Sequence, residues 1–203
     1  MVKNKEQLNR FIEYLSECFN RSGTILVKLE ECIDQAMEIV NNNNKNNNTR
    51  DKKTQLRHAL SVALETAIVK SVPGAFLSHS TKEMDFKNPH TFAYDNIVMF
   101  ENRHYTIDAT VTDSKGYLSD SIRPAGNKRS DGYEWTKFKT KQKHQSIIDV
   151  LVGGHITIAD DFSYILCDFD LIVDTKSAFD LNNWHKSMHS NKSYLCKSVC
   201  RIV

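Results

Sequence analysis

A β-hairpin pattern across residues 90–110 constrains the fold of this chain more than any other feature. Two runs rich in β-branched and aromatic residues flank the polar tip Glu101-Asn102-Arg103. His90 opens the first predicted strand, and Asp108 lies deep in the second. Antiparallel strands place residues that are distant in sequence opposite one another, so we expect this imidazole and this carboxylate to meet. They are two of the three groups of a nucleophilic triad.

Three helices are expected before the hairpin. Residues 5–20 and 24–40 carry apolar side chains at helical spacing, and their succession predicts a helical hairpin. The Asn-rich segment 41–53 is expected to be a linker or loop, because so polar a tract cannot offset the entropy lost on ordering. The third and most strongly helical segment, 54–71, is ended by Val72-Pro73-Gly74.

The order of the remaining elements points to an α+β fold. Short strands are predicted at 75–78, 156–158 and 163–173, and a helix at 135–152, ended by a Gly-Gly pair. We therefore expect an N-terminal helical hairpin (1–40), the Asn-rich linker (41–53) and an α+β core domain (54–203). In that core, a central helix packs on an antiparallel-rich sheet.

Composition limits the classes of partner. The chain of 203 residues has 40% hydrophobic and 26% charged residues, which is typical of a globular protein. It has no apolar run of membrane-spanning length and no secretory leader, so we expect no membrane segment and a cytoplasmic location, or delivery to a host cytosol. The five cysteines show no metal-ligand spacing, which favours free thiols.

The order of a helix, a Val-Pro turn, a strand, a His-headed strand and a strand ending Ile-Asp-Ala-Thr resembles the transglutaminase-like branch of the papain-like superfamily. The match covers about residues 54–110, at Val72-Pro73, His90 and Asp108-Ala109-Thr110. The resemblance implies a protease, deamidase or acyltransferase that acts on protein or peptide carboxamides and needs no cofactor. His90 would be the general base, and Asp108 would orient its ring.

The nucleophile of that family departs from the pattern here. The family has a cysteine at the start of its helix, but no cysteine lies between residues 54 and 61. Thr54 and Ser61 are the hydroxyl candidates, and Ser61 follows Gln55 at a spacing similar to the family's oxyanion glutamine and nucleophile. An inactivating change at 59 or 61, a natural pseudoenzyme, and a thiol supplied by Cys18 or Cys32 all remain open.

The same elements also resemble a nuclease core of the PD-(D/E)xK type, which is built as helix, three strands, helix and strand. The matching residues are Glu65 on the helix, Asp95 at a strand start and Asp108-Ala109-Thr110 on the next strand. This alternative implies Mg²⁺ held by the carboxylates of Glu65, Asp95 and Asp108. Thr110 stands where the family has lysine, and Lys115 follows after a turn.

A basic segment, Lys128–Lys143, supports a nucleic-acid partner for the nuclease alternative. It combines six lysines and arginines with the aromatic residues Tyr133, Trp135 and Phe138, the composition that suits single-stranded nucleic acid.

A third pattern is the pair of His-x-Thr motifs at His104 and His155, which resembles the two-histidine phosphodiesterases.

Overall fold

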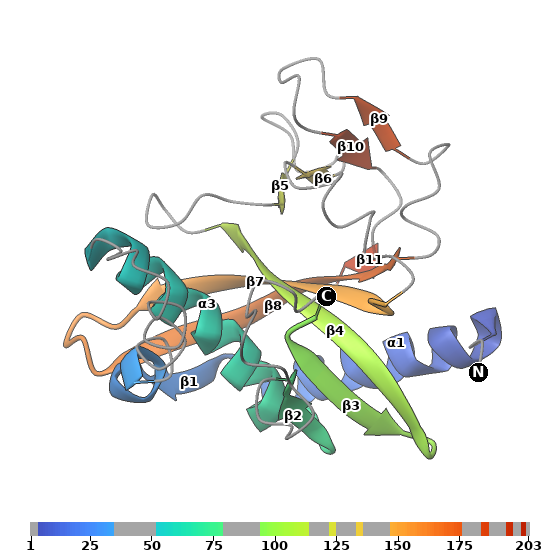
Figure 1. Ribbon diagram of the computed structural model, residues 1–203, viewed down its shortest axis with the longest axis horizontal. Coiled ribbons are helices and arrows are strands. Elements are labelled where there is room, and N and C mark those ends of the chain that lie inside the picture. Colours follow the sequence, from blue (N-terminus) through green and yellow to red (C-terminus); the bar gives the residue numbers. More distant parts are fainter. Residues whose placement is uncertain are drawn as a thin grey trace, which may run out of the picture.

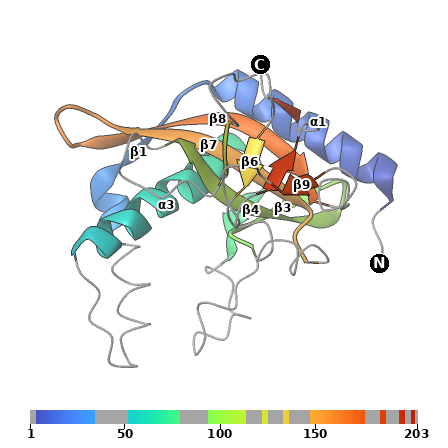
Figure 2. The same cartoon turned by 90° about the horizontal axis from the view of Figure 1, so that it is seen from above.

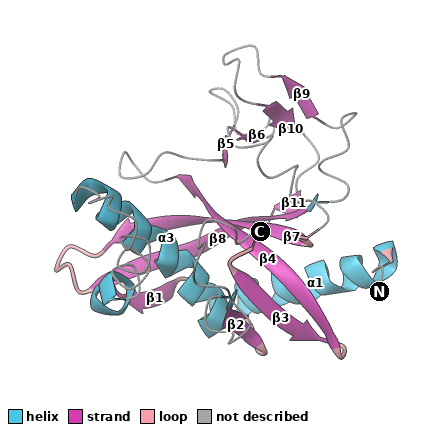
Figure 3. Ribbon diagram, viewed as in Figure 1, coloured by secondary structure: helices cyan, strands magenta, loops and turns pink. Residues whose placement is uncertain are grey.

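The computed structural model describes residues 4–34, 52–78, 94–113 and 147–175, together with short strands at 122–124, 133–135, 184–186, 194–196 and 200–201. These residues form an α+β fold in which helices pack on a mixed, mostly antiparallel sheet, as the sequence predicts (Figures 1 and 3). None of the helices described is long and apolar enough to cross a membrane.

The main sheet has seven strands and two long helices packed on it. The helices are α1 (Lys5–Ser22) and α3 (Lys52–Ser71), and residues 29–34 form a short helical segment between them. The strands are β1 (Ile25–Lys28), β2 (Ala75–Leu77), β3 (Asn96–Phe100), β4 (Arg103–Asp113), β7 (Val150–Ile158), β8 (Tyr164–Asp174) and β11 (Cys200–Arg201).

The strand order is β1-β8-β7-β4-β3-β2, and β11 also pairs with β8. All of these pairs are antiparallel except β4–β7, which is parallel. The β7–β8 hairpin extends beyond the other strands at one end of the sheet (Figures 1 and 2). A smaller sheet in the order β5-β6-β10-β9 is made of β5 (Ile122–Pro124), β6 (Tyr133–Trp135), β10 (Tyr194–Cys196) and β9 (Trp184–Lys186).

Local sequence explains where α1 begins and ends. The Asn4 side chain accepts from the backbone N–H of Gln7, and the Gln7 side chain accepts from the N–H of Asn4, which completes a capping box. Gly23 ends the helix with a positive φ of 59°, a conformation that glycine adopts without strain. The buried stripe between these ends is made of Leu8, Phe11, Leu15, Cys18 and Phe19.

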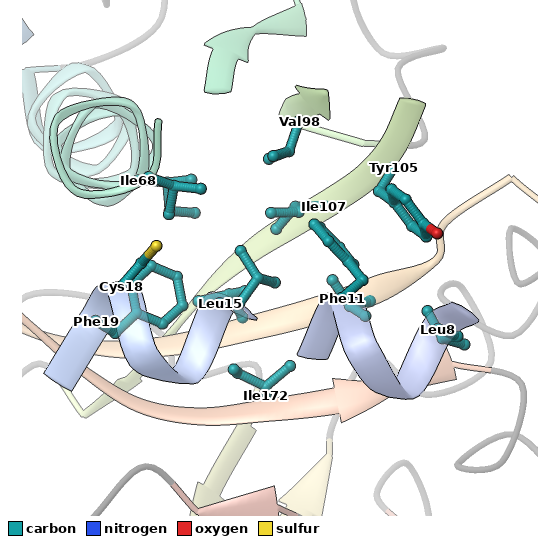
Figure 4. Close-up of a cluster of buried hydrophobic side chains, with 13 residues drawn as sticks. Leu8, Phe11, Leu15, Cys18, Phe19, Ile68, Val98, Tyr105, Ile107 and Ile172 are labelled. Carbon is teal, nitrogen blue, oxygen red and sulfur yellow. The ribbon is translucent and has the colours of Figure 1, made fainter. Parts of the chain in front are cut away.

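The two long helices cover the same face of the twisted sheet. Along β4, Tyr105 and Ile107 cluster with α1 and with Ile68 of α3. Val111, of the same parity, clusters with the α3 residues Leu60, Ala63, Leu64 and Ala67. Alternate residues of a strand point to the same face of a sheet, so α1 and α3 both pack on the face to which Tyr105, Ile107 and Val111 point. We call it the helix-covered face. Figure 4 shows side chains of α1 and Ile68 of α3 converging on Val98 and Ile107.

The predicted helix over 24–40 is wrong for residues 25–28, which form β1. This strand pairs with β8, with Ile25 opposite Cys167, and its burial alternates so that Val27 is inside while Leu26 and Lys28 are exposed. Val27, before the predicted boundary at residue 40, shares a core with described residues after it, such as Leu64 and Ile165.

The predicted helix over 135–152 is wrong at both ends, because Trp135 belongs to β6 and β7 already begins at Val150 and runs through Gly153-Gly154. Residues 136–146 lie outside the described residues. A central strand is buried on both faces, so its apolar run does not alternate and imitates a helix. The predicted hairpin is confirmed from Asn96 onward, whereas its predicted start at His90 lies outside the described residues. The third helix and the strands near 75–78, 156–158 and 163–173 are confirmed. The hairpin turns at Glu101 and Asn102, both at positive φ, as a tight two-residue turn requires.

Candidate functional site

The strands β3 and β4 part beside Asp95, and this fork holds the candidate site. Their pairing ends where Asn96 faces Ile107, although β4 continues to Asp113 alongside β7. The backbone N–H of Asp95 still donates to the carbonyl of Ile107 at 2.8 Å. The Asp95 carboxylate then accepts from the backbone N–H of Ala109 at 2.8 Å, so a side chain takes the place of the departing strand.

The same contacts bring two predicted acids together. Asp108 lies between Ile107 and Ala109, the two residues whose backbone groups Asp95 contacts. Asp95 is half-buried, and Asp108 is only 3% exposed. A buried carboxylate is costly unless cations or hydrogen-bond donors compensate its charge. The fork therefore places two carboxyl groups at adjacent positions of the sheet.

Asp108 points away from the helices. Its neighbours Ile107 and Ala109 pack on the helix-covered face, so alternation directs Asp108 to the opposite face of the sheet. Thr110, two residues on, shares that direction and is also buried. The chemistry-bearing side chains of β4 are thus separated from its core-forming ones.

Asn96 ties the fork to α3. Its side-chain N–H donates to the Glu65 carbonyl oxygen at 3.0 Å, and the residue is fully buried. The bond places the helical turn that carries Glu65 beside the start of β3, next to Asp95. Ser78, just after β2, donates its backbone N–H to the Asp95 carbonyl at 2.8 Å. Three elements therefore hold Asp95 in position.

The donor set fits a magnesium ion held by two residues rather than three. No group of three metal-ligating side chains occurs among the residues that the structure describes, so Glu65 does not join Asp95 and Asp108 in such a group. Mg²⁺ commonly takes one or two protein carboxylates and fills its other positions with water and phosphate oxygens. Asp95 and Asp108 supply carboxylate oxygens of that kind from adjacent strands.

Two buried polar residues, Asn96 and Asp149, are not among the residues predicted from the sequence. Asp149, just before β7, is buried, and its carboxylate accepts from the Thr106 backbone N–H at 2.9 Å. This contact joins β4 to β7 at the end of their parallel pairing, which is a structural role. The only sequence signal for Asn96 is its place directly after Asp95.

Only part of the predicted triad lies within the residues that the structure describes. His90 lies outside the described residues, as do Lys115 and the side chains of Lys128–Lys143. Ser61 is half-buried on α3, the helix that covers the face from which Asp108 points away. The triad of Ser61, His90 and Asp108 stays a prediction.

The buried cysteines do not have the environment of a nucleophile. Cys18, Cys32 and Cys167 are free thiols and are all buried. Burial, reinforced by the charge of Glu31, raises the pKa of Cys32 to about 12. Because the thiolate is the reactive form, this thiol is inert near neutral pH.

The two-histidine alternative is inconsistent with the strand register. Parallel pairing sets Ile107 beside Val150, so His104 is level with residue 147, and His155 lies eight residues farther along. At 3.3 Å per residue the two histidines are roughly 26 Å apart. They do not act on one phosphate.

No family model, no curated protein and no solved structure matches this chain.

Proposed function

We propose that this protein is a metal-dependent nuclease whose site is the fork at Asp95 and Asp108. One observation carries the proposal. The helix α3 precedes the three antiparallel strands β2, β3 and β4, and the later strand β7 lies parallel to β4. The two aspartates are adjacent at the point where β3 and β4 part. This arrangement is similar to the first helix, the three strands and the last strand of the PD-(D/E)xK core, whose second helix would fall in residues 136–146, outside the described residues.

Asp95 and Asp108 would hold Mg²⁺, which neutralises phosphate charge and makes a bound water more acidic. Asn96 positions Asp95 by fixing the start of β3 against α3. Thr110 shares the sheet face of Asp108 in the place of the family's lysine. Its hydroxyl can orient a water by hydrogen bonding but carries no charge, so any positive charge at the phosphate has to come from another residue.

The basic segment Lys128–Lys143 is the candidate source of that charge. It lies in the connection between β4, which carries Asp108, and β7, whose Leu151 pairs with Asp108. Lysine and arginine contacts to phosphates provide most sequence-independent affinity for nucleic acid. We propose a nucleic-acid backbone as the substrate and a cytosolic site of action, which the free thiols of Cys18, Cys32 and Cys167 support.

A cleavage assay with matched aspartate variants tests the proposal. Supercoiled plasmid and single-stranded RNA are incubated with Mg²⁺ or Mn²⁺, with EDTA as the negative control. We expect metal-dependent cleavage that falls on the order of 100-fold in Asp95→Asn and in Asp108→Asn, because each loses a charged ligand. Asp161→Asn, at an exposed carboxylate in the β7–β8 turn, should cleave like the wild type. Absence of cleavage with every divalent metal, or full activity in Asp108→Asn, would refute it.

The carboxamide-directed enzyme is the alternative proposal. Its support is the order of α3, the Pro73 turn, β2 and the β3–β4 hairpin, which is the order that the transglutaminase-like resemblance implies. Ser61 would be the nucleophile, His90 the base and Asp108 its orienter. A Ser61→Cys or Ala59→Cys variant should then react with iodoacetamide far faster than the chain's own cysteines. Uniformly slow labelling would retire this alternative.

A further inference from the structure

The turn between β7 and β8 carries an aromatic side chain that the fold does not need. Phe162 is 69% exposed, and its φ is +59°. The Phe162 N–H donates a hydrogen bond to the Ala159 carbonyl at 2.9 Å. The Ala159 N–H in turn donates to the Tyr164 carbonyl at 2.9 Å, which closes the turn. Glycine, asparagine or aspartate would adopt this conformation with less strain. Strain and exposure at one residue are a common mark of a functional contact.

A groove lies beside this turn. It has a volume of about 480 Å³ and is bounded by the turn on one side and by residues 28–34 on the other. Its apolar lining is supplied by Leu29, Ile33, Phe162 and Tyr164. Ile33 and Tyr164 are 42% and 36% exposed, so the lining is open to solvent. A bond of 3.0 Å from the Leu29 N–H to the Ser163 carbonyl holds the two sides together.

The rim of the groove is acidic. Glu30 and Asp34 are exposed in its wall, and Asp160 and Asp161 are exposed in the adjoining turn, against Lys28 as the cation of the lining. Hydrogen bonds from the Ser163 hydroxyl and N–H lower the pKa of Asp161, so this group stays ionised at neutral pH. Four carboxylates around aromatic and aliphatic surface repel phosphate and favour lysine or arginine.

We propose that this groove, defined by Ile33, Phe162 and Tyr164 with Glu30 and Asp34, docks a basic peptide segment of a partner protein. Phe162 is the apolar anchor, and the carboxylates pair with the peptide's cations. The groove is separate from the fork, because Asp108 is level with Leu151 and the strand continues to Ile158 before the turn, roughly 23 Å away. The proposal therefore stands without the nuclease activity.

Peptide binding measured by fluorescence anisotropy tests the proposal on the whole chain. The probe is a labelled peptide of alternating leucine and lysine, and the matched probes replace lysine with glutamate or leucine with glycine. We expect the Leu-Lys peptide to bind about tenfold or more tightly than either matched probe. Its affinity should fall as salt rises, because exposed charge pairs are screened.

Variants identify the surface. Phe162→Asn should weaken binding of the Leu-Lys peptide about tenfold. The midpoint of thermal unfolding of this variant should equal that of the wild type or rise, because asparagine adopts a positive φ with less strain. The double variant Glu30→Gln and Asp34→Asn should weaken binding roughly threefold and flatten the salt dependence. Met99→Thr removes another exposed apolar side chain, which is 45% exposed on β3. This control variant should change neither the affinity for the Leu-Lys peptide nor its salt dependence.

Several results would overturn the proposal. Unchanged affinity in Phe162→Asn, or equal affinity for the Leu-Glu peptide, would remove the anchor or the charge complementarity. Sedimentation that shows a dimer lost in Phe162→Asn would assign the patch to a second copy of this chain. Phe162-dependent binding of a duplex DNA oligonucleotide would assign it to nucleic acid.

Discussion

The two faces of the main sheet differ in what their side chains do. On the helix-covered face, β4 presents Tyr105, Ile107 and Val111 to the apolar clusters around α1 and α3. On the opposite face the same strand presents Thr106, Asp108 and Thr110. A single strand of alternating residues thus contributes stability on one side and candidate chemistry on the other.

The contrast extends to the neighbouring strands. Val150, Val152 and Ile172 join the helix-covered core, whereas exposed Thr157 and half-buried His155 lie on the other side of β7. Substitutions on the two faces should therefore affect different properties of the protein. Those on the helix-covered face should change the free energy of unfolding most, and those at the fork should change the proposed nuclease activity most.

The largest effect on stability is expected from Phe11→Ala. The Phe11 ring is fully buried and stacks on Tyr105 with a centroid separation of 4.0 Å, so its removal leaves a cavity between α1 and β4. We expect a loss of about 3–5 kcal/mol in the free energy of unfolding, measured by urea denaturation. Thr157→Ala, exposed on the opposite face, is the matched control and should stay within about 0.5 kcal/mol. Similar losses in the two variants would break the comparison.

Gly154→Ala should come next. A Cβ at this position would meet a methyl group of Leu64 on α3 and the backbone carbonyl of Asp168 at 2.8 Å. We expect a loss of about 1–3 kcal/mol, because a packed core accepts extra volume poorly. Adding Leu64→Ala should not restore the stability of Gly154→Ala, since the Asp168 carbonyl cannot withdraw. A neutral Gly154→Ala in thermal and urea unfolding would contradict the close approach of α3 to β7.

Alkaline pH should weaken the helix-covered core through its thiols. Burial raises the pKa of both Cys32 and Cys167 from 9.0 to about 12. Because the pKa of each thiol is higher in the folded state than in the unfolded state, its contribution to the free energy of unfolding is fully present below pH 9. This contribution is lost as the pH rises toward 12. We expect a fall of at most about 1.4 kcal/mol per pH unit for each thiol, followed by urea unfolding from pH 8 to 11. The double variant Cys32→Ala and Cys167→Ala should show a shallower decline, and an unchanged slope would contradict the assignment.

The smallest effect is expected at the surface pair of Arg10 and Glu101. Their 3.0 Å ion pair joins α1 to the β3–β4 turn, but both side chains are more than two-fifths exposed. Arg10→Ala should therefore cost about 0.2–1 kcal/mol, and the difference should shrink in high salt. A larger loss that salt does not reduce would mean that Arg10 contributes by packing instead.

Local sequence patterns determined much of this molecule by themselves. Asn4 and Gln7 cap α1, Glu101 and Asn102 form the hairpin turn, and the Val72-Pro73-Gly74 stop ends α3. These features depend on residues close together in the chain, so spacing alone predicts them. The two acids at the fork were also visible as candidates, through their place at the start of one predicted strand and deep in the next.

Only the tertiary structure decided which strands pair beyond the predicted hairpin and which acids meet. Residues 25–28 are a strand because β8 supplies their hydrogen bonds, and Val150 begins a strand because it lies between β4 and β8. Asp95 and Asp108 are adjacent because β3 ends at Asn96 while β4 continues, which leaves the Ala109 N–H for a side chain to satisfy. The pairing of β1 with β8 and of β4 with β7 joins segments that are distant in the sequence, so no local pattern specifies it.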